Sequence, residues 1–489
     1  MATYFSDAFS IDPELLEKHG AFNISLITDL PLFIDPFLLF NSKKPEYQAL
    51  HAAMIRYLVF LKDQAAAGTV TTPLLRAWYC FPEVRQTWLG FSQTGNSGSG
   101  LGMDFAEALH KSLHDLFPDF GTERVTRGSH IEKVCLIRSG VGRDNISDFT
   151  TNLIKGYLCA YTQEFTLQYF SDAQRREVSI RGVRFNYDTM VWEPDRYVLP
   201  WVNDDYVILT PKDILTRDEN WISREDFFRS FEEIPTAIPD AQLRAQVENY
   251  FRRVLVRPKD REPNKEEKAQ AAATTLHEYP ELVDYYIRYK EDRGEKATNV
   301  STAKVRSSER LFVRQVAEFQ HILHMVTGFY KVAGNTYEEV HERIGYLKDQ
   351  IENKGCHRIF YIDGEPIGTE QMLQIMYRLV WIGTPSDVSR EVNDGRGPAD
   401  FKISRGAQDK TIVEMKLGSN KQLERNLQKQ AEIYQKASDA PKAVKVILFF
   451  SETEEQRVRS ILKKLQLSQS RDIVLIDARN DNKPSGSKA

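Results

Sequence analysis

Two short strand-like runs near the C-terminal end of this 489-residue chain place the tightest limits on its fold. Residues 399–404 read ADFKIS, and residues 411–417 read TIVEMKL. The RGAQDK segment between them contains a glycine and an aspartate, which are typical of a short hairpin loop. Side chains alternate between the two faces of a strand, so one face of this hairpin is apolar and the other is charged.

A symmetric hairpin pairs Phe401 with Val413 and Asp400 with Glu414. The apolar residues then face a core, and Asp400, Glu414 and Lys416 share the opposite face. Two adjacent carboxylates repel each other, and Mg²⁺ removes this repulsion because it binds carboxylate oxygens while keeping several waters. A lysine two residues beyond the second carboxylate can hold a water beside the ion. This set of residues suits phosphodiester hydrolysis.

A helix is expected after the second strand, because Leu423, Leu427, Gln430 and Tyr434 fall on one face at spacings of 4, 3 and 4 residues. Two interpretations are open for the polar residues of this face, Gln430 and Tyr434. They form either the polar edge of a packed helix or part of a functional site beside the hairpin.

With Pro398 before Asp400, Glu414-Met415-Lys416 after it and a QxxxY helix, this region resembles the PD-(D/E)XK, or restriction-endonuclease-like, nuclease superfamily. The QxxxY helix is typical of its RecB-like and Cas4-like branch. The resemblance covers roughly the last quarter of the chain. It implies that Asp400, Glu414 and the backbone carbonyl of Met415 hold Mg²⁺, for which Mn²⁺ can substitute, and that Lys416 orients the attacking water.

The same resemblance suggests supporting residues around this centre. Gln430 and Tyr434 would brace the site or contact the nucleic-acid backbone. Glu370, near the start of a predicted helix, resembles an additional acidic residue that many members carry, and Glu391 is a rival for that role. Arg396 in the glycine-rich NDGRGP segment could contact a phosphate or anchor an acidic side chain.

The elements expected around the hairpin follow the order of the restriction-endonuclease-like core. Residues 370–381 form an amphipathic helix, DVSREV a first strand, and AVKVILFFS a buried strand. A helix at 452–467 and a last strand, DIVLIDA, complete the order α-β-β-β-α-β-α-β. A DG turn in HRIFYIDGEPI predicts a further hairpin just before the first helix.

The chain as a whole is expected to be α/β with several parts. We expect an N-terminal mixed α/β domain at 1–255, a helical connector at 256–355, the nuclease domain at 356–478 and a polar tail at 479–489. Within the first part, residues 47–63 have helical spacing and the run 131–140 predicts a strand. The N-terminal domain is a candidate for recognition, regulation or partner binding.

Composition limits the class of protein only loosely. The net charge of −4 argues mildly against a passive DNA-coating protein, although residues 402–429 contain seven Lys or Arg and only three Asp or Glu. The four cysteines are far apart in sequence and form no CxxC pair. We therefore expect neither a structural zinc site nor a disulfide framework. No secretory signal or membrane span is evident, so a cytoplasmic location is expected.

The sequence therefore predicts a Mg²⁺-dependent deoxyribonuclease, most simply an endonuclease in a prokaryotic restriction or anti-phage defence setting. Two alternatives stay open. One is a catalytically silent nucleic-acid-binding or scaffold protein, and the other is a RecB-like exonuclease. DNA is the expected partner, and no association with a membrane is expected. The sequence is also compatible with a homo-oligomer, or with a protein partner that binds the N-terminal domain.

Overall fold

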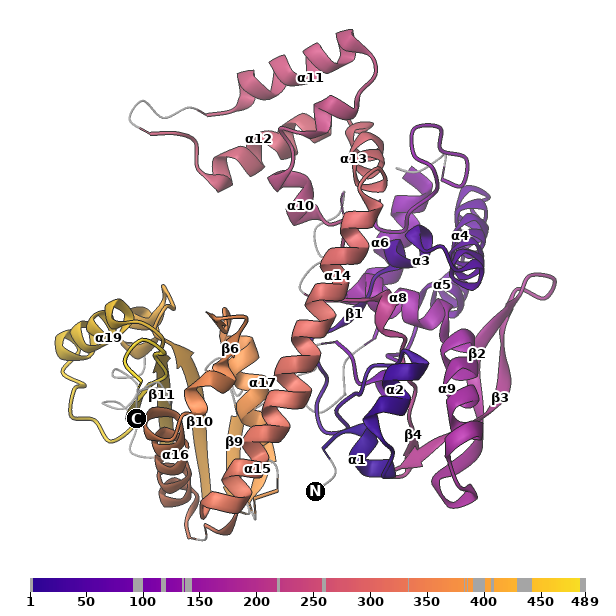
Figure 1. Cartoon of the computed structure of the whole chain (residues 1–489). Coiled ribbons are helices and arrows are strands. Elements are labelled where there is room, and N and C mark those ends of the chain that lie inside the picture. Colours follow the sequence, from indigo (N-terminus) through magenta and orange to yellow (C-terminus); the bar gives the residue numbers. More distant parts are fainter. Residues whose placement is uncertain are drawn as a thin grey trace.

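The computed structural model describes residues 3–90, 100–115, 120–133, 136, 143–217, 220–256, 261–332, 334–381, 383–384, 386–389, 401–405, 409–428 and 442–483. These residues form a mixed α/β structure with four separate β-sheets, in agreement with the expected class (Figure 1). No helix within these ranges is long and apolar enough to cross a membrane.

The N-terminal region is a group of helices beside a long β-hairpin (Figure 1). Helix α4 (Pro45–Ala66) contains the helix predicted at 47–63. Strands β2 (Arg175–Asn186) and β3 (Val191–Val202) pair antiparallel. The other main elements here are α1 (Phe5–Phe9), α2 (Pro13–His19), β1 (Phe33–Ile34), α3 (Pro36–Asn41), α5 (Thr72–Tyr79), α6 (Met103–Asp115), α8 (Arg143–Leu153), α9 (Lys155–Tyr169), β4 (Asp205–Tyr206) and β5 (Leu215–Thr216).

The strand predicted at 131–140 is wrong for the residues that the structure describes there. Residues 131–133 form a turn that leads into a helical residue, and residue 136 is helical. Burial does not alternate, because Ile131, Glu132 and Lys133 are all buried. Lys133 is held inside by ion pairs with Glu123 at 3.0 Å and Asp284 at 2.5 Å, so tertiary contacts decide the local structure.

A helical segment connects the N-terminal and C-terminal regions, and its first helices lie before residue 256, where the connector was expected to begin. It begins with a projecting arm of α10 (Arg224–Arg229), α11 (Ala241–Val254) and α12 (Lys265–Glu278), which is followed by α13 (Leu282–Glu291). A long helical stretch then runs diagonally between the two regions in Figure 1. It consists of α14 (Gly294–Glu309), a π-helical segment η5 (Arg310–Gln315) and α15 (Val316–Val326).

The C-terminal region is built on a five-stranded sheet with the strand order β12-β11-β10-β9-β8. Strand β10 is central, and it pairs antiparallel with β9 and parallel with β11. Along the chain these strands are β8 (Asp387–Ser389), β9 (Phe401–Arg405), β10 (Asp409–Leu417), β11 (Lys442–Phe449) and β12 (Ile473–Asp477). They are preceded by helix α17 (Glu370–Trp381), whose bounds coincide with those expected at 370–381.

Helices cover both faces of this sheet. Helix α16 (Thr336–Asn353), from the end of the helical segment, packs on β10 and β12. On the other face, Ile447 of β11 packs in a separate apolar cluster with Leu423, Leu427 and Val458. These residues come from the helical residues 423–428 and from α19 (Glu452–Lys464). The sheet is therefore the middle layer of the C-terminal region.

A buried ion-pair network fastens α16 to the antiparallel side of the sheet. The Glu339 carboxylate accepts hydrogen bonds from Arg343 Nε at 2.9 Å and Arg405 Nη2 at 2.7 Å. Ser386 Oγ, just before β8, donates to the same carboxylate at 2.5 Å. Glu339 and Arg343 are fully buried, so their charges depend on one another for compensation.

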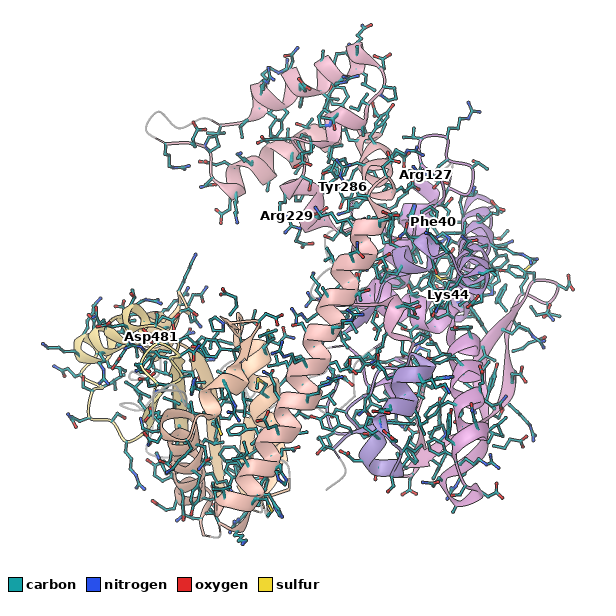
Figure 2. All side chains as sticks on the ribbon, viewed as in Figure 1. Phe40, Lys44, Arg127, Arg229, Tyr286 and Asp481 are labelled. Atoms are coloured by element: carbon teal, nitrogen blue, oxygen red, sulfur yellow. The ribbon has the colours of Figure 1, made fainter. Side chains whose placement is uncertain are left out.

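Buried acidic side chains mark the place where the N-terminal helices meet α13. Glu291, in the last turn of α13, accepts a hydrogen bond from the backbone N–H of Arg127, and its Oε1 also forms a hydrogen bond with His130 Nε2. Figure 2 labels Arg127 from the N-terminal region and Tyr286 from α13. Glu132 and Asp35 are also fully buried. Burial, together with the nearby Asp35 carboxylate, raises the pKa of Glu132 to about 8.

Glu132 should make the stability of the protein depend on pH. Because its pKa is higher in the folded than in the unfolded chain, the folded state binds more protons between about pH 4.5 and 8. The free energy of unfolding should therefore fall as pH rises through this range. Glu132→Gln resembles the protonated acid, and should be more stable than the wild type at pH 8 by on the order of 1–3 kcal/mol.

Urea unfolding of both proteins at pH 5 and pH 8 measures this effect. The advantage of the variant should shrink at pH 5, where the wild-type carboxyl group is protonated in the folded state. An equal difference at the two pH values would contradict the assignment.

Candidate functional site

The central strand β10 presents its charged residues on one face, as the sequence predicted. Val413, Met415 and Leu417 are buried, whereas Glu414 and Lys416 alternate with them. Two residues along a strand span roughly 6–7 Å, so the two charged side chains are neighbours. In the register with β11, Lys416 lies beside Ile447, which places both on the face covered by residues 423–428 and α19.

The predicted pairing of the hairpin is confirmed at the residues that the structure describes. Val413 of β10 lies opposite Phe401 of β9, and Thr411 lies opposite Ile403. The antiparallel pairing extends to Arg405 and Asp409, the described residues on either side of positions 406–408. Five residues that the sequence assigned to the site or its supports lie outside the described residues: Asp400, Gln430, Tyr434, Glu391 and Arg396.

Glu370 is brought to the end of β10 that carries Lys416. It is the first residue of α17, and its Oε1 accepts the backbone N–H of Leu417 at 3.1 Å and the Asn420 side-chain amide at 2.6 Å. Its Oε2 lies 3.6 Å from Lys416 Nζ. Two hydrogen bonds and one ion pair therefore hold this carboxylate beside the predicted lysine, although 46 residues separate the two in sequence.

Lys445 is a charged neighbour of Glu414 that the sequence reasoning missed. It lies on β11 directly opposite Glu414, and its Nζ donates to Glu414 Oε2 at 2.7 Å. The Lys445 side chain is only 4% exposed, against 21% for Glu414. A single lysine within the otherwise apolar run AVKVILFF was a signal for such a residue, since a buried ammonium group requires a partner of opposite charge.

The arrangement supplies oxygen ligands and two ammonium groups in one place. Glu414 and Glu370 offer the carboxylates, and Lys416 and Lys445 balance their charges. Within the described ranges, no three His, Cys, Asp or Glu side chains are grouped closely enough to hold a metal ion. An all-oxygen set suits Mg²⁺, which binds through one or two carboxylates and retains waters.

Two family models match parts of the chain, and both are described only as domains of unknown function. One, DUF8370, matches residues 10–223, and the other, DUF8371, matches residues 336–452. The second range runs from α16 to β11 and includes Glu370, Glu414, Lys416 and Lys445. No curated protein and no solved structure matches the chain.

The contact between Glu414 and Lys445 should be measurable as a coupling energy. Lys445→Met keeps an unbranched side chain of similar length but leaves a partly buried carboxylate without its ammonium partner. We expect the free energy of unfolding to fall by about 1–2 kcal/mol. Adding Glu414→Gln removes the unpaired charge and should recover part of the loss.

Chemical denaturation of the wild type, both single variants and the double variant closes the cycle. A coupling of about 1 kcal/mol or more is expected for a hydrogen-bonded, largely buried pair. Additive effects of the two substitutions, within about 0.3 kcal/mol, would mean that the pair does not interact in solution.

Proposed function

We propose that the protein is a metal-dependent nuclease whose hydrolytic site lies on β10 of the C-terminal region. The observation that carries this proposal is the position of Lys416. It shares a strand face with Glu414, two residues away, and its ammonium group lies 3.6 Å from the Glu370 carboxylate. The resemblance to the PD-(D/E)XK superfamily assigns an acid and a lysine to these two positions of β10.

The order of elements gives the proposal further support. From α17 onward, the described chain runs helix, three strands, the helical residues 423–428, strand, helix and strand. This is the order expected from the resemblance. The confirmed Phe401–Val413 pairing is also the register on which the predicted pairing of Asp400 with Glu414 depends.

Each residue has a distinct role in the proposed reaction. Glu414, together with Asp400, would hold the cation, which neutralises charge that develops on the phosphate. Lys416 would orient the attacking water and donate a hydrogen bond to the phosphoryl oxygens. Glu370 would hold Lys416 in place, because its other oxygen is already fixed by Leu417 and Asn420. Gln430 and Tyr434 are proposed as supports.

DNA is the proposed substrate, and internal cleavage is the proposed mode. An N-terminal region ahead of the nuclease part would provide recognition or control, as in stand-alone prokaryotic restriction or anti-phage defence effectors. Closed-circular DNA distinguishes an endonuclease from an exonuclease. An endonuclease cuts the circle, whereas an exonuclease requires a free end.

Substitution of Lys416 should abolish cleavage without unfolding the protein. We expect Lys416→Ala and Asp400→Ala to reduce Mg²⁺-dependent nicking of supercoiled plasmid by about 100-fold or more, since each removes a group that acts on the water or the ion. Lys410→Ala is the matched control, because Lys410 is an exposed lysine of the same strand. Circular dichroism checks that all three variants fold.

Full cleavage by both Lys416→Ala and Asp400→Ala would end the catalytic assignment. One observation favours a second candidate, a nucleic-acid-binding protein without catalysis. Lys445 already compensates Glu414, so this acid has a structural partner that requires no metal. Wild-type protein that binds DNA but cleaves no circular, linear or single-stranded DNA with either Mg²⁺ or Mn²⁺ would support this candidate.

A further inference from the structure

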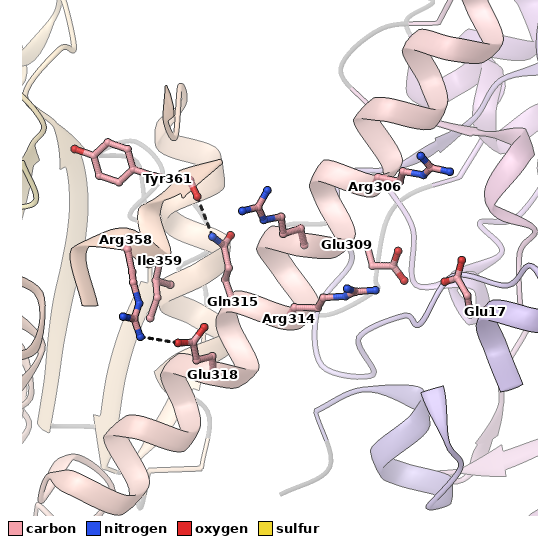
Figure 3. A pocket seen from close by; sticks show the side chains of 10 residues that line it. Glu17, Arg306, Glu309, Arg314, Gln315, Glu318, Arg358, Ile359 and Tyr361 are labelled. Carbon is pink, nitrogen blue, oxygen red and sulfur yellow. Dashed lines mark hydrogen bonds and ion pairs between the residues drawn. The ribbon is translucent and has the colours of Figure 1, made fainter. Parts of the chain in front are cut away.

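Four arginines line one open cavity beside the C-terminal sheet. Arg306, Arg310 and Arg314 follow one another at intervals of four residues along α14 and η5, and each is exposed. Arg358, just before β6 (Tyr361–Ile362), joins them around a cavity of about 600 Å³ (Figure 3). We call these four residues the arginine groove.

Two of the four arginines have acidic partners at the surface. Arg310 Nη1 lies 2.6 Å from Asp363, and Arg358 Nη2 lies 3.1 Å from Glu318. Exposed pairs of this kind contribute little to stability and exchange readily with other anions. Both guanidinium groups can therefore turn toward a phosphate.

The other two arginines have no close acidic partner among the residues that the structure describes. The nearby Glu17 and Glu309 both bind Lys212, which leaves Arg306 and Arg314 without a carboxylate within 4.0 Å. Their charge still acts at longer range. The hydrogen bond from Lys212, followed by the attraction of Arg314 and Arg306, lowers the pKa of Glu17. The groove thus retains unsatisfied capacity for an anion.

The groove adjoins the segment that leads into the proposed active site. Gln315 Nε2 donates to the backbone oxygen of Tyr361 at 2.9 Å, and Asp363 lies in the turn between β6 and β7 (Glu365–Pro366) (Figure 3). Four residues after β7, the chain enters α17 at Glu370, which contacts Lys416. The β6–β7 hairpin therefore borders the groove and is continuous in sequence with the helix that carries Glu370.

The spacing of the arginines suits a polynucleotide better than a single small anion. Eight helical residues rise about 12 Å from Arg306 to Arg314. Phosphates of one DNA strand follow each other every 3.4 Å along the helix axis, so this distance spans roughly three to four of them. Arginine forks bind phosphate oxygens with two parallel hydrogen bonds.

We propose that the arginine groove binds the phosphodiester backbone of the nucleic-acid substrate. This inference rests on the proposed nuclease function and adds the path of the substrate across η5. The competing explanation is an ionic seam that only joins the N-terminal and C-terminal regions.

Binding of a fluorescent 30-base-pair duplex in EDTA tests the proposal without cleavage. The variant is Arg306→Ala/Arg314→Ala, in which alanine preserves the helix. The control is Arg181→Ala/Arg196→Ala, which removes two exposed arginines of the β2–β3 hairpin. Anisotropy is measured from 50 to 300 mM salt, because each neutralised phosphate contributes about 0.9 to the slope of log K against log salt.

We expect the Arg306/Arg314 variant to bind about tenfold more weakly at 100 mM salt, with a slope shallower by about two, and the control to match the wild type. If the Arg306/Arg314 variant binds the duplex with the affinity and salt slope of the wild type, the assignment of the groove to nucleic acid is wrong, whether or not its melting temperature falls. The nuclease proposal would remain intact. No binding by the wild type would overturn both. A mononucleotide that raises the melting temperature of the wild type but not of the variant, with equal duplex binding, would reassign the groove to a free phosphate compound.

Discussion

The pairing of β10 with its two neighbours determines where the charged residues of the C-terminal region lie. A shift of one residue would turn Glu414 and Lys416 into the core and expose Val413 and Met415. Full burial of the apolar set therefore sets the register, and the register sets the charged face. The same pairing on the parallel side brings Lys445 against Glu414. The proposed chemistry thus depends on the hydrophobic packing of the opposite face of the strand.

Electrostatic compensation is the second requirement of this layer. Lys445 is nearly excluded from water and forms an ion pair with Glu414, whereas Lys416 forms an ion pair with Glu370. On the other face, Glu339 is shared by Arg343 and Arg405 and ties α16 to β9. The Glu414–Lys445, Glu370–Lys416 and Glu339–Arg405 contacts each join different elements of the fold. These contacts fix the sheet between its helices and limit the movement of the site residues.

The long helical stretch forms one wall of the arginine groove. Segment η5 borders the arginine groove on the side of the β6–β7 hairpin, and the N-terminal region contributes Glu17 on the other side (Figure 3). A substrate in the groove would therefore contact both regions of the chain. If the groove binds the substrate as proposed, that substrate would join the N-terminal region to the proposed cleavage site, since both regions line the groove.

Local patterns allowed much of the C-terminal fold to be predicted from the sequence. Helix α17 was predicted at its observed bounds because its apolar residues recur at helical spacing, and the β9–β10 register followed from strict alternation. Partners that depend on long-range pairing could not be predicted in this way. Lys445 meets Glu414 only through parallel pairing. The described residues of the run at 131–140, which are 131–133 and 136, form no strand, and Lys133 is held there by buried ion pairs. The positions of Asp400, Gln430 and Tyr434 lie outside the described residues.

The central claim is that the Glu414 face of β10 holds a divalent cation, and Mn²⁺ binding followed by electron paramagnetic resonance tests it most directly. Titration of the metal-free protein should show saturable loss of the free Mn²⁺ signal. Glu414→Gln should abolish this binding, whereas Lys410→Ala should leave it unchanged. Equal binding by wild type and Glu414→Gln would contradict the account.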